Sequence, residues 1–286
     1  MRKTYTTLTD NYITSRLQGR TGNMMFQIAH GYAKSLEYNR QFVLPSKESS
    51  SHHLEKNLFR KLSFDIETTN QSGVENINCS FEYNEYKPAD SKPTVFTGWF
   101  QSEKYFGKHS ESVKDLYSPP ISFLDKVFNY YPFFKNKTVA AINVRRGDYL
   151  HPSQNKRHPV VSLEYINHAY TNLPNHDVLL VMSDDMDWCR ENIKLPNVVF
   201  NDSTKFWDAE GIWLLSLCDH FIISNSTYSW WGAYLSRTPD KTVIAPDTWF
   251  GPEHDLLGQS KDIYCKDWIK IPTVFQDGYI NLVKDE

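Results

Sequence analysis

Two adjacent arginines offer the clearest chemistry in this sequence. Arg145 and Arg146 follow the apolar run 139–144, and Gly147 and Asp148 come next. Planar guanidinium groups match phosphate oxygens in pairs, and a neighbouring glycine lets a bulky ligand approach the backbone. The sequence therefore predicts an anion site here. The alternative is a surface ion pair between an arginine and Asp148.

A second polar segment follows another apolar run. Residues 224–232 read Ser-Asn-Ser-Thr-Tyr-Ser-Trp-Trp-Gly. Ser226 and Thr227 would stand at the start of a helix, where backbone N–H groups and the helix dipole favour phosphate. Tyr228 could pack against a nucleoside. The alternative is that Ser226 and Thr227 only cap the helix, but the nearby arginines favour phosphate binding.

A glycine-rich turn precedes the first helical segment. Residues 19–23 contain Arg20, Gly22 and Asn23, and they match neither the dinucleotide-binding pattern nor the P-loop. Such a turn allows a ligand to approach the backbone, and Arg20 would add a cation. By itself this signal is weak, because many tight turns look alike.

Acidic residues follow the apolar run that ends near residue 182. Asp185 and Asp187 have the D-x-D spacing that holds a divalent metal in some enzymes, and Asp184 precedes them. The alternative is a helix start at Ser183 or Asp184, with one carboxylate that accepts from a base or ribose. Because the arginines already supply positive charge, we expect no metal here.

Alternating strand and helix patterns must position these groups. Apolar runs separated by segments of helical periodicity predict β-α-β units and a parallel sheet buried on both faces. The predicted strands are 139–144, 177–182, 197–200, 221–223 and 242–245, and the predicted helices are 162–170, 185–193, 207–218 and 229–235. The arginines and the segment 224–232 then follow carboxyl ends of strands, where open α/β sheets bind ligands.

The first half of the chain carries one clear unit of the same kind. An apolar helical face runs from Met25 to Leu36, and residues 41–44 predict a strand stopped by Pro45. Residues 46–93 are polar and predict only loops and short elements. Prolines at 119, 120 and 132 flank a predicted linker helix. We therefore expect an α/β fold whose second half is a Rossmann-like domain, with a domain boundary near residues 118–137.

Composition narrows the classes of function. The chain has 286 residues, with 31 Lys and Arg against 34 Asp and Glu, so a net charge of −3 gives no general attraction to nucleic acid. No apolar run has the length of a signal peptide or membrane span, so we expect a cytoplasmic protein, with peripheral membrane association left open. Four widely spaced cysteines predict reduced core thiols rather than zinc ligands or disulfides.

Five segments together resemble one known family. They are residues 19–27, 98–106, 145–149, 183–188 and 224–232, and they cover most of the chain. Their order and spacing are similar to those of glycosyltransferase family 11, the α-1,2-fucosyltransferases that use GDP-fucose.

The resemblance implies a fold and a reaction. The fold would be of the GT-B type, with two facing Rossmann-like domains, 1–136 on the acceptor side and 137–286 binding the donor. L-Fucose would pass with inversion from GDP-fucose to the 2-hydroxyl of a galactose-terminated glycan, without a metal or other cofactor. Trp99 and Gln101 would lie on the acceptor side. The implied donor-binding residues are Arg146, Asn143, Asp184, Asp185, Asn225, Ser226, Thr227, Tyr228, Arg20, Gly22 and Asn23.

The same resemblance assigns the catalytic roles. Arg145, supported by Arg146, would stabilise the charge that develops on the β-phosphate as the sugar leaves. Asp148 is the nearest candidate for the base that takes the acceptor proton, or it orients Arg145. The other candidate bases are His158, Asp202 and Glu210. Departure of the leaving group ahead of attack would reduce the need for a base.

Two departures from the family pattern leave alternatives open. Asn143 stands where the family carries a histidine, so it is either an altered donor contact or a polar spacer. The family pattern is also not matched at Arg20, Thr21 and Met24. Because these positions would face the acceptor, the resemblance does not identify the acceptor. The alternatives are a transferase that uses another GDP-6-deoxyhexose and a non-catalytic protein that binds a sugar or nucleotide.

Overall fold

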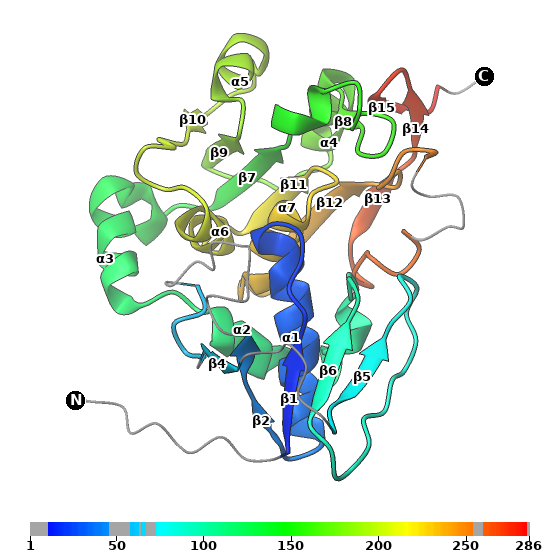
Figure 1. Cartoon of the computed structure of the whole chain (residues 1–286). Helices are drawn as coiled ribbons and strands as arrows, with labels where there is room; N and C mark the ends of the chain where they lie inside the picture. The colour runs from blue at the N-terminus through cyan, green and yellow to red at the C-terminus, as the bar shows by residue number, and fades with distance from the viewer. Residues whose placement is uncertain (1–10, 46–57, 63, 67–72, 254–259, 285–286) are drawn as a thin grey trace. The chain divides into compact units, whose positions relative to one another are not determined.

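The computed structural model describes residues 11–45, 58–62, 64–66, 73–253 and 260–284, and therefore only part of the polar segment 46–93. The chain forms two compact units, Met1–Tyr117 and Ser118–Glu286. Each unit contains a parallel sheet with helices packed on it (Figure 1), which confirms the predicted α/β class. The predicted boundary after residue 136 lies one helix too late.

Helix α3 (Ile121–Tyr130) accounts for the difference in the boundary. The ring of Phe123 lies 5.2 Å from that of Trp213 and 6.1 Å from that of Phe206, centroid to centroid. Tyr131 donates a hydrogen bond of 3.3 Å to the side chain of Asn201. Because these partners lie some 70 residues further along the chain, the flanking prolines could not reveal that this helix joins the second unit.

A four-stranded parallel sheet in the order β2-β1-β6-β5 forms the first unit. Its strands are β1 (Tyr12–Ser15), β2 (Gln41–Phe42), β5 (Glu75–Asn78) and β6 (Thr94–Thr97). A separate parallel pair consists of β3 (Leu44–Pro45) and β4 (Phe64–Ile66). The predicted strand 41–44 is thus divided between two sheets, and Pro45 is the last residue of β3 rather than the residue after it.

Helix α1 (Thr21–Glu37) packs on β1 with the face that the sequence predicted. Met25, Ile28 and Ala29 have no exposed surface, whereas Leu36 at the last turn is 40% exposed. Gly19 turns the chain into this helix with φ +78°, a conformation that favours glycine. The other helices of this unit are η1 (Glu103–Tyr105), η2 (Gly107–His109) and α2 (Ser110–Tyr117).

A six-stranded parallel sheet in the order β10-β9-β7-β11-β12-β13 forms the centre of the second unit. Its strands are β7 (Val139–Val144), β9 (Val178–Ser183), β10 (Val198–Phe200), β11 (His220–Ile223), β12 (Thr242–Pro246) and β13 (Ile269–Ile271). All six residues of β7 are buried, as expected for a central strand covered on both faces. The five strands predicted for this half are confirmed within one or two residues.

Capping residues and backbone turns set the first residue of several helices in this unit. They are α4 (Leu163–Thr171), α5 (Met186–Asn192), α6 (Ala209–Ser216) and α7 (Thr227–Leu235), with the short turns η3 (Pro132–Lys135) and η4 (Gly147–Leu150). Ser162 caps α4, as predicted. Helix α6 starts two residues later than predicted, because Asp208 has φ +49° and cannot be helical.

A small sheet near the end of the chain was not predicted. β14 (Thr273–Gln276) and β15 (Tyr279–Leu282) form an antiparallel hairpin, and β15 also pairs with β8 (Val160–Val161). Asp277 and Gly278 both have positive φ, as the turns favoured in two-residue hairpins require. The hairpin therefore follows a local Asp-Gly signal that the sequence does contain.

The cysteines are free, as predicted, but only two of them lie in the core. Cys189 and Cys218 are buried, whereas Cys79 and Cys265 are partly exposed. Among the described residues, no helix combines the length and apolar character that crossing a membrane requires.

His30 is an unusual member of the core of the first unit. Its ring stacks on Phe100 at 3.9 Å between centroids and lies edge-on to Phe96 and Tyr105. Its side chain has no exposed surface, and neither ring nitrogen has a hydrogen-bond partner. Burial, and secondarily the charge of Lys34, hold the pKa of His30 well below its usual value of 6.5. The imidazole therefore packs as a neutral aromatic ring.

Acid should destabilise the protein through His30. Below pH 6.5 the unfolded chain binds a proton that the folded chain rejects, so stability falls as pH falls, by up to about 1.4 kcal/mol per pH unit for this one group. His30→Phe removes this proton linkage. As the pH falls from 6.5 to 5, the free energy of unfolding of His30→Phe, measured with urea, should therefore rise relative to that of the wild type. A constant difference across that range would contradict the assignment.

Candidate active site

The two arginines stand at the point where the order of the central sheet reverses. From β7 the chain continues to β9 and β10 on one side of the sheet, and β11, β12 and β13 lie on the other side. Arg145 and Arg146 directly follow β7, and the turn 224–226 directly follows the adjacent strand β11. In open α/β sheets this position forms a crevice at the carboxyl edge. The two strongest sequence signals therefore meet at one place.

Arg145 is held between two carboxylates. Its Nη1 lies 2.6 Å from Oδ2 of Asp184, and its Nη2 pairs with Oδ1 of Asp148. The guanidinium carbon also lies 5.1 Å from the ring centroid of Tyr149. Of the two roles predicted for Asp148, a base or a residue that orients Arg145, this ion pair fits the second.

Arg146 makes different contacts, through its Nε and its backbone N–H, and its two terminal guanidinium nitrogens form no hydrogen bond within the described residues. Its Nε lies 3.0 Å from Oδ2 of Asp185, its backbone N–H donates to Oδ1 of Asp184 at 2.8 Å, and its guanidinium carbon lies 3.9 Å from the ring centroid of Trp188. The side chain is 8% exposed. Among the described residues, Nη1 and Nη2 of Arg146 have no partner. These two groups are available for an anion.

Gly147 serves a different purpose from the one predicted. A Cβ atom at this position would collide with the carboxylate of Asp184. The space beside the glycine is therefore filled by the side chain that holds Arg145, not left open for a ligand. Gly147 is required for the ion pair between β7 and β9 to form.

Helix α7 presents its first turn to the same edge. Ser226 caps this helix and accepts from the N–H of Tyr228 at 3.3 Å, so the capping alternative for its hydroxyl is correct. The N–H of Ser224 donates to the carbonyl of Asn143 at 3.2 Å, which ties the turn to the end of β7. Thr227 is the first residue of the helix and is half-buried.

Two asparagines predicted to bind a donor point into the protein instead. Asn143 accepts from the hydroxyl of Ser229 at 2.8 Å and donates to the carbonyl of Met182 at 3.4 Å, which fits the polar-spacer alternative. The amide of Asn225 donates to the carbonyls of Pro159 and Trp249, each at 2.9 Å. Asn143 thus ties β7 to α7 and β9, and Asn225 ties the turn after β11 to two neighbouring loops.

The structure distinguishes the candidate bases by the groups that each one contacts. His158 stacks on Tyr149 at 5.0 Å between ring centroids, close to Arg145. Asp202 accepts from Tyr130 and Thr204, and these hydrogen bonds hold its pKa below the usual value. Glu210 pairs with Lys126 at 2.6 Å. Asp148 contacts Arg145 directly, and His158 stacks on the same Tyr149 ring that Arg145 contacts.

The D-x-D carboxylates are engaged with protein groups. Asp185 accepts from the N–H of Trp188 at 3.2 Å and pairs with Arg146, while Asp187 pairs with Arg190 at 3.2 Å. Asp185 therefore caps α5, one residue after the Asp184 that the alternative prediction named.

The predicted residues of the first unit gather at the start of α1. Nε2 of Gln101 donates to Oδ1 of Asn23 at 2.9 Å, which joins the loop after β6 to the first turn of the helix. Gly22 is buried, Trp99 is half-buried, and Arg20 precedes the helix with an exposed side chain. Oε1 of Gln101 is buried without a partner. This unit therefore also places its polar groups at the carboxyl edge of its sheet.

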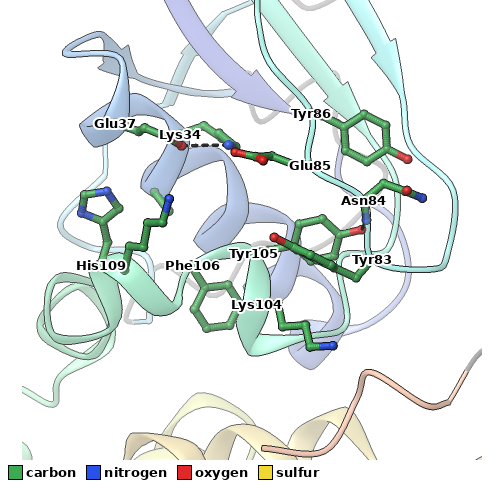
Figure 2. A pocket seen from close by; sticks show the side chains of 12 residues that line it. Lys34, Glu37, Tyr83, Asn84, Glu85, Tyr86, Lys104, Tyr105, Phe106 and His109 are labelled. Carbon is green, nitrogen blue, oxygen red and sulfur yellow. Dashed lines mark hydrogen bonds and ion pairs between the residues drawn. The ribbon is translucent and has the colours of Figure 1, made fainter.

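A shallow pocket lies at the other end of α1. It encloses about 420 Å³, including its open mouth, and Figure 2 shows the rings of Tyr83 and Tyr105 together with Lys104 and the ion pair between Lys34 and Glu37. Lys34 is eleven residues beyond Asn23, or about 16 Å along a helix. None of the predicted site residues lines this pocket.

Trp207 and Asp208 were missed by the sequence analysis. Trp207 is 56% exposed, and the hydroxyl of Tyr228 donates to the carbonyl of Asp208 at 2.8 Å. The sequence was read as a helix from residue 207 onward, which hid an exposed aromatic residue in the turn after β10.

Gly147→Ala should destabilise the second unit. The new Cβ would displace the Asp184 carboxylate, and overpacking of this kind costs about 1–3 kcal/mol. Gly107→Ala is the matched control, because a Cβ there meets no atom within 4 Å. Chemical unfolding should show a loss for Gly147→Ala and a change within about 0.5 kcal/mol for Gly107→Ala. Equal effects would mean that Asp184 does not occupy this space.

Comparison with known proteins agrees with the resemblance seen in the sequence. The family model described as glycosyl transferase family 11 matches residues 2–272. An α-1,2-colitosyltransferase of Escherichia coli is 30% identical over 91% of this chain and 98% of its own length. Galactoside α-(1,2)-fucosyltransferase 2 of Rattus norvegicus is 35% identical over 47% of this chain and 40% of its own length.

Similarity to solved structures is more distant. The structure of the NodZ α-1,6-fucosyltransferase co-crystallised with GDP is 12% identical, with a TM-score of 0.49 over 82% of this chain and 95% of that one. The family match and the nearly full-length colitosyltransferase relative carry the assignment. This chain is a member of glycosyltransferase family 11.

Proposed function

We propose that this enzyme transfers L-fucose from GDP-fucose to the 2-hydroxyl of a β-galactoside, with inversion at the anomeric carbon. Membership of the family and relatives named as α-1,2-transferases support the reaction class and the linkage. The observation that carries the proposal is the pair of fixed arginines beside the first turn of α7, at the switch point of the sheet.

The chemistry of the leaving group explains why this arrangement suits a nucleoside diphosphate. When the bond between the anomeric carbon and the β-phosphate oxygen breaks, the electron pair stays with the phosphate. Cations fixed in advance lower the barrier because they need no reorganisation as charge develops. Arg145, oriented by Asp148 and Asp184, and the free Nη groups of Arg146 are suited to this role.

The balance of charge at the site explains why helix α7 is needed. Two arginines face three carboxylates, those of Asp148, Asp184 and Asp185, so the cluster alone carries a net negative charge. Backbone N–H groups at the first turn of α7, near Ser226 and Thr227, add partial positive charge without a further counter-ion. We propose that the diphosphate lies between this turn and the two guanidinium groups, with no metal.

The two units would divide the substrates. In this proposal the second unit binds GDP-fucose, and the first unit binds the acceptor through Arg20, Gly22, Asn23, Trp99 and Gln101. The bond between Asn23 and Gln101 supports a shared role for these two loops. The acceptor proton would pass to Asp148 or His158, or to solvent if the leaving group departs first.

A related donor is the second candidate. The E. coli relative is named as a colitosyltransferase, and colitose is fucose without its 3-hydroxyl group. Contacts with the diphosphate would be the same for both donors. Only a group that hydrogen-bonds the 3-hydroxyl would separate them, and such a group can discriminate strongly because it is left unpaired by the wrong sugar.

The test is donor turnover in the presence of EDTA. With lactose as acceptor, the wild-type enzyme should release GDP from GDP-fucose, and Arg145→Ala should lower kcat by about 10²–10³-fold. Arg190→Ala is the control, since Arg190 is an exposed arginine of the same unit that pairs only with Asp187 and stacks on Phe200.

Three results would change the assignment. Faster release from GDP-colitose than from GDP-fucose would favour the related donor. Loss of activity in EDTA with rescue by Mn²⁺ would replace the arginine mechanism with a metal-dependent one. Full activity of Arg145→Ala would refute the proposed leaving-group contact.

A further inference from the structure

Trp207 stands out among the eight tryptophans, all of which lie in the described part of the chain. Its side chain is 56% exposed, whereas each of the others is buried or half-buried. An exposed aromatic ring offers a flat apolar face on which the ring of a ligand can stack. Its position just before α6 is not explained by packing.

The backbone on both sides of Trp207 is fixed. Phe206 is fully buried against the aromatic rings of Tyr130 and Tyr131, and its carbonyl accepts from Nδ2 of Asn201 at 3.1 Å. The carbonyl of Trp207 itself accepts from the N–H of Glu210 at 3.1 Å in the first turn of α6. The indole is therefore presented by an ordered backbone, which lowers the entropy lost on binding.

Asp208 holds a strained conformation beside this ring. Its φ of +49° and ψ of −119° lie outside the regions that residues with a Cβ normally adopt. The hydroxyl of Tyr228 holds the turn by donating to the Asp208 carbonyl at 2.8 Å. Gly211 makes room for that hydroxyl, because a Cβ there would collide with it. Strain that the surroundings impose in this way is typical of functional sites.

The strained turn lies at the same edge of the sheet as the arginines. A Cβ at Gly211 would be 3.3 Å from Cε of Met182, which precedes Ser183 and the Asp184 that holds Arg145. Tyr228 belongs to the first turn of α7, so its hydrogen bond to Asp208 also ties the backbone next to Trp207 to the turn that we propose holds the diphosphate.

We propose that Trp207 stacks on the purine base of the donor nucleotide and that Tyr228 is a positioning residue that keeps the turn in place. The inference rests on the proposed function, because the arginines must hold the diphosphate. An exposed indole offers a flat apolar surface, which suits a base rather than a phosphate.

Binding of GDP and of inorganic pyrophosphate separates the base contact from the phosphate contact. By calorimetry, Trp207→Ala should weaken GDP binding about tenfold or more and leave pyrophosphate binding unchanged, since stacking contributes only when a base is present. Trp207→Phe should keep most of the affinity. Tyr228→Phe, which removes only the hydroxyl, should weaken GDP several-fold and spare pyrophosphate.

Two further variants serve as controls. Arg145→Ala should weaken both ligands, because it removes a phosphate contact. Tyr279→Ala removes another exposed aromatic ring of the same unit, on β15, and should change neither affinity. Unchanged GDP binding by Trp207→Ala, or an equal loss for pyrophosphate, would overturn the inference while leaving the proposed function standing. Failure of the wild-type protein to bind GDP at all would instead refute the proposed function.

A spectroscopic readout covers the case in which Trp207→Ala does not fold. GDP should quench part of the tryptophan fluorescence of the wild-type protein, because a stacked base quenches an exposed indole. In Trp207→Phe that part of the quenching should disappear although GDP still binds. Quenching of the same size in both proteins would place the base elsewhere.

Discussion

The ion pair between Arg145 and Asp184 is the constraint on which the site depends. An arginine meant for an anionic ligand must stay in place when the ligand is absent, and a neighbouring carboxylate holds it there at the cost of partly neutralising its charge. Two other features supply positive potential at the site. Arg146 is bound through Nε and its backbone, which leaves its Nη groups to face a ligand, and α7 adds positive potential without a counter-ion.

Parallel topology brings these groups together from distant parts of the chain. β7 pairs with β9 and with β11, so the residues after all three strands share one edge. Asn143 links the end of β7 to α7 through Ser229 and to β9 through Met182, and Gly147 leaves room for Asp184. Substitution of one of these buried connectors should therefore alter the arginines without touching a ligand.

The sequence predicted five strands of the second unit, most helices and the arginine cluster, because these depend on local apolar patterns and on strand ends. It did not predict features that depend on distant partners. α3 joins the second unit because Phe123 meets Trp213, and Asn225 points inward because Pro159 and Trp249 offer carbonyls. Trp207 was assigned to a helix because nothing local showed that Asp208 would adopt a positive φ.

The central claim is that the carboxylates orient Arg145 for the diphosphate rather than compete with it. A double-mutant cycle with Arg145→Ala and Asp184→Asn, read by calorimetric affinity for GDP, tests this directly. The account predicts that Asp184→Asn weakens GDP binding when Arg145 is present and has little effect when it is absent. Tighter GDP binding by Asp184→Asn, or an equal loss in both backgrounds, would contradict it.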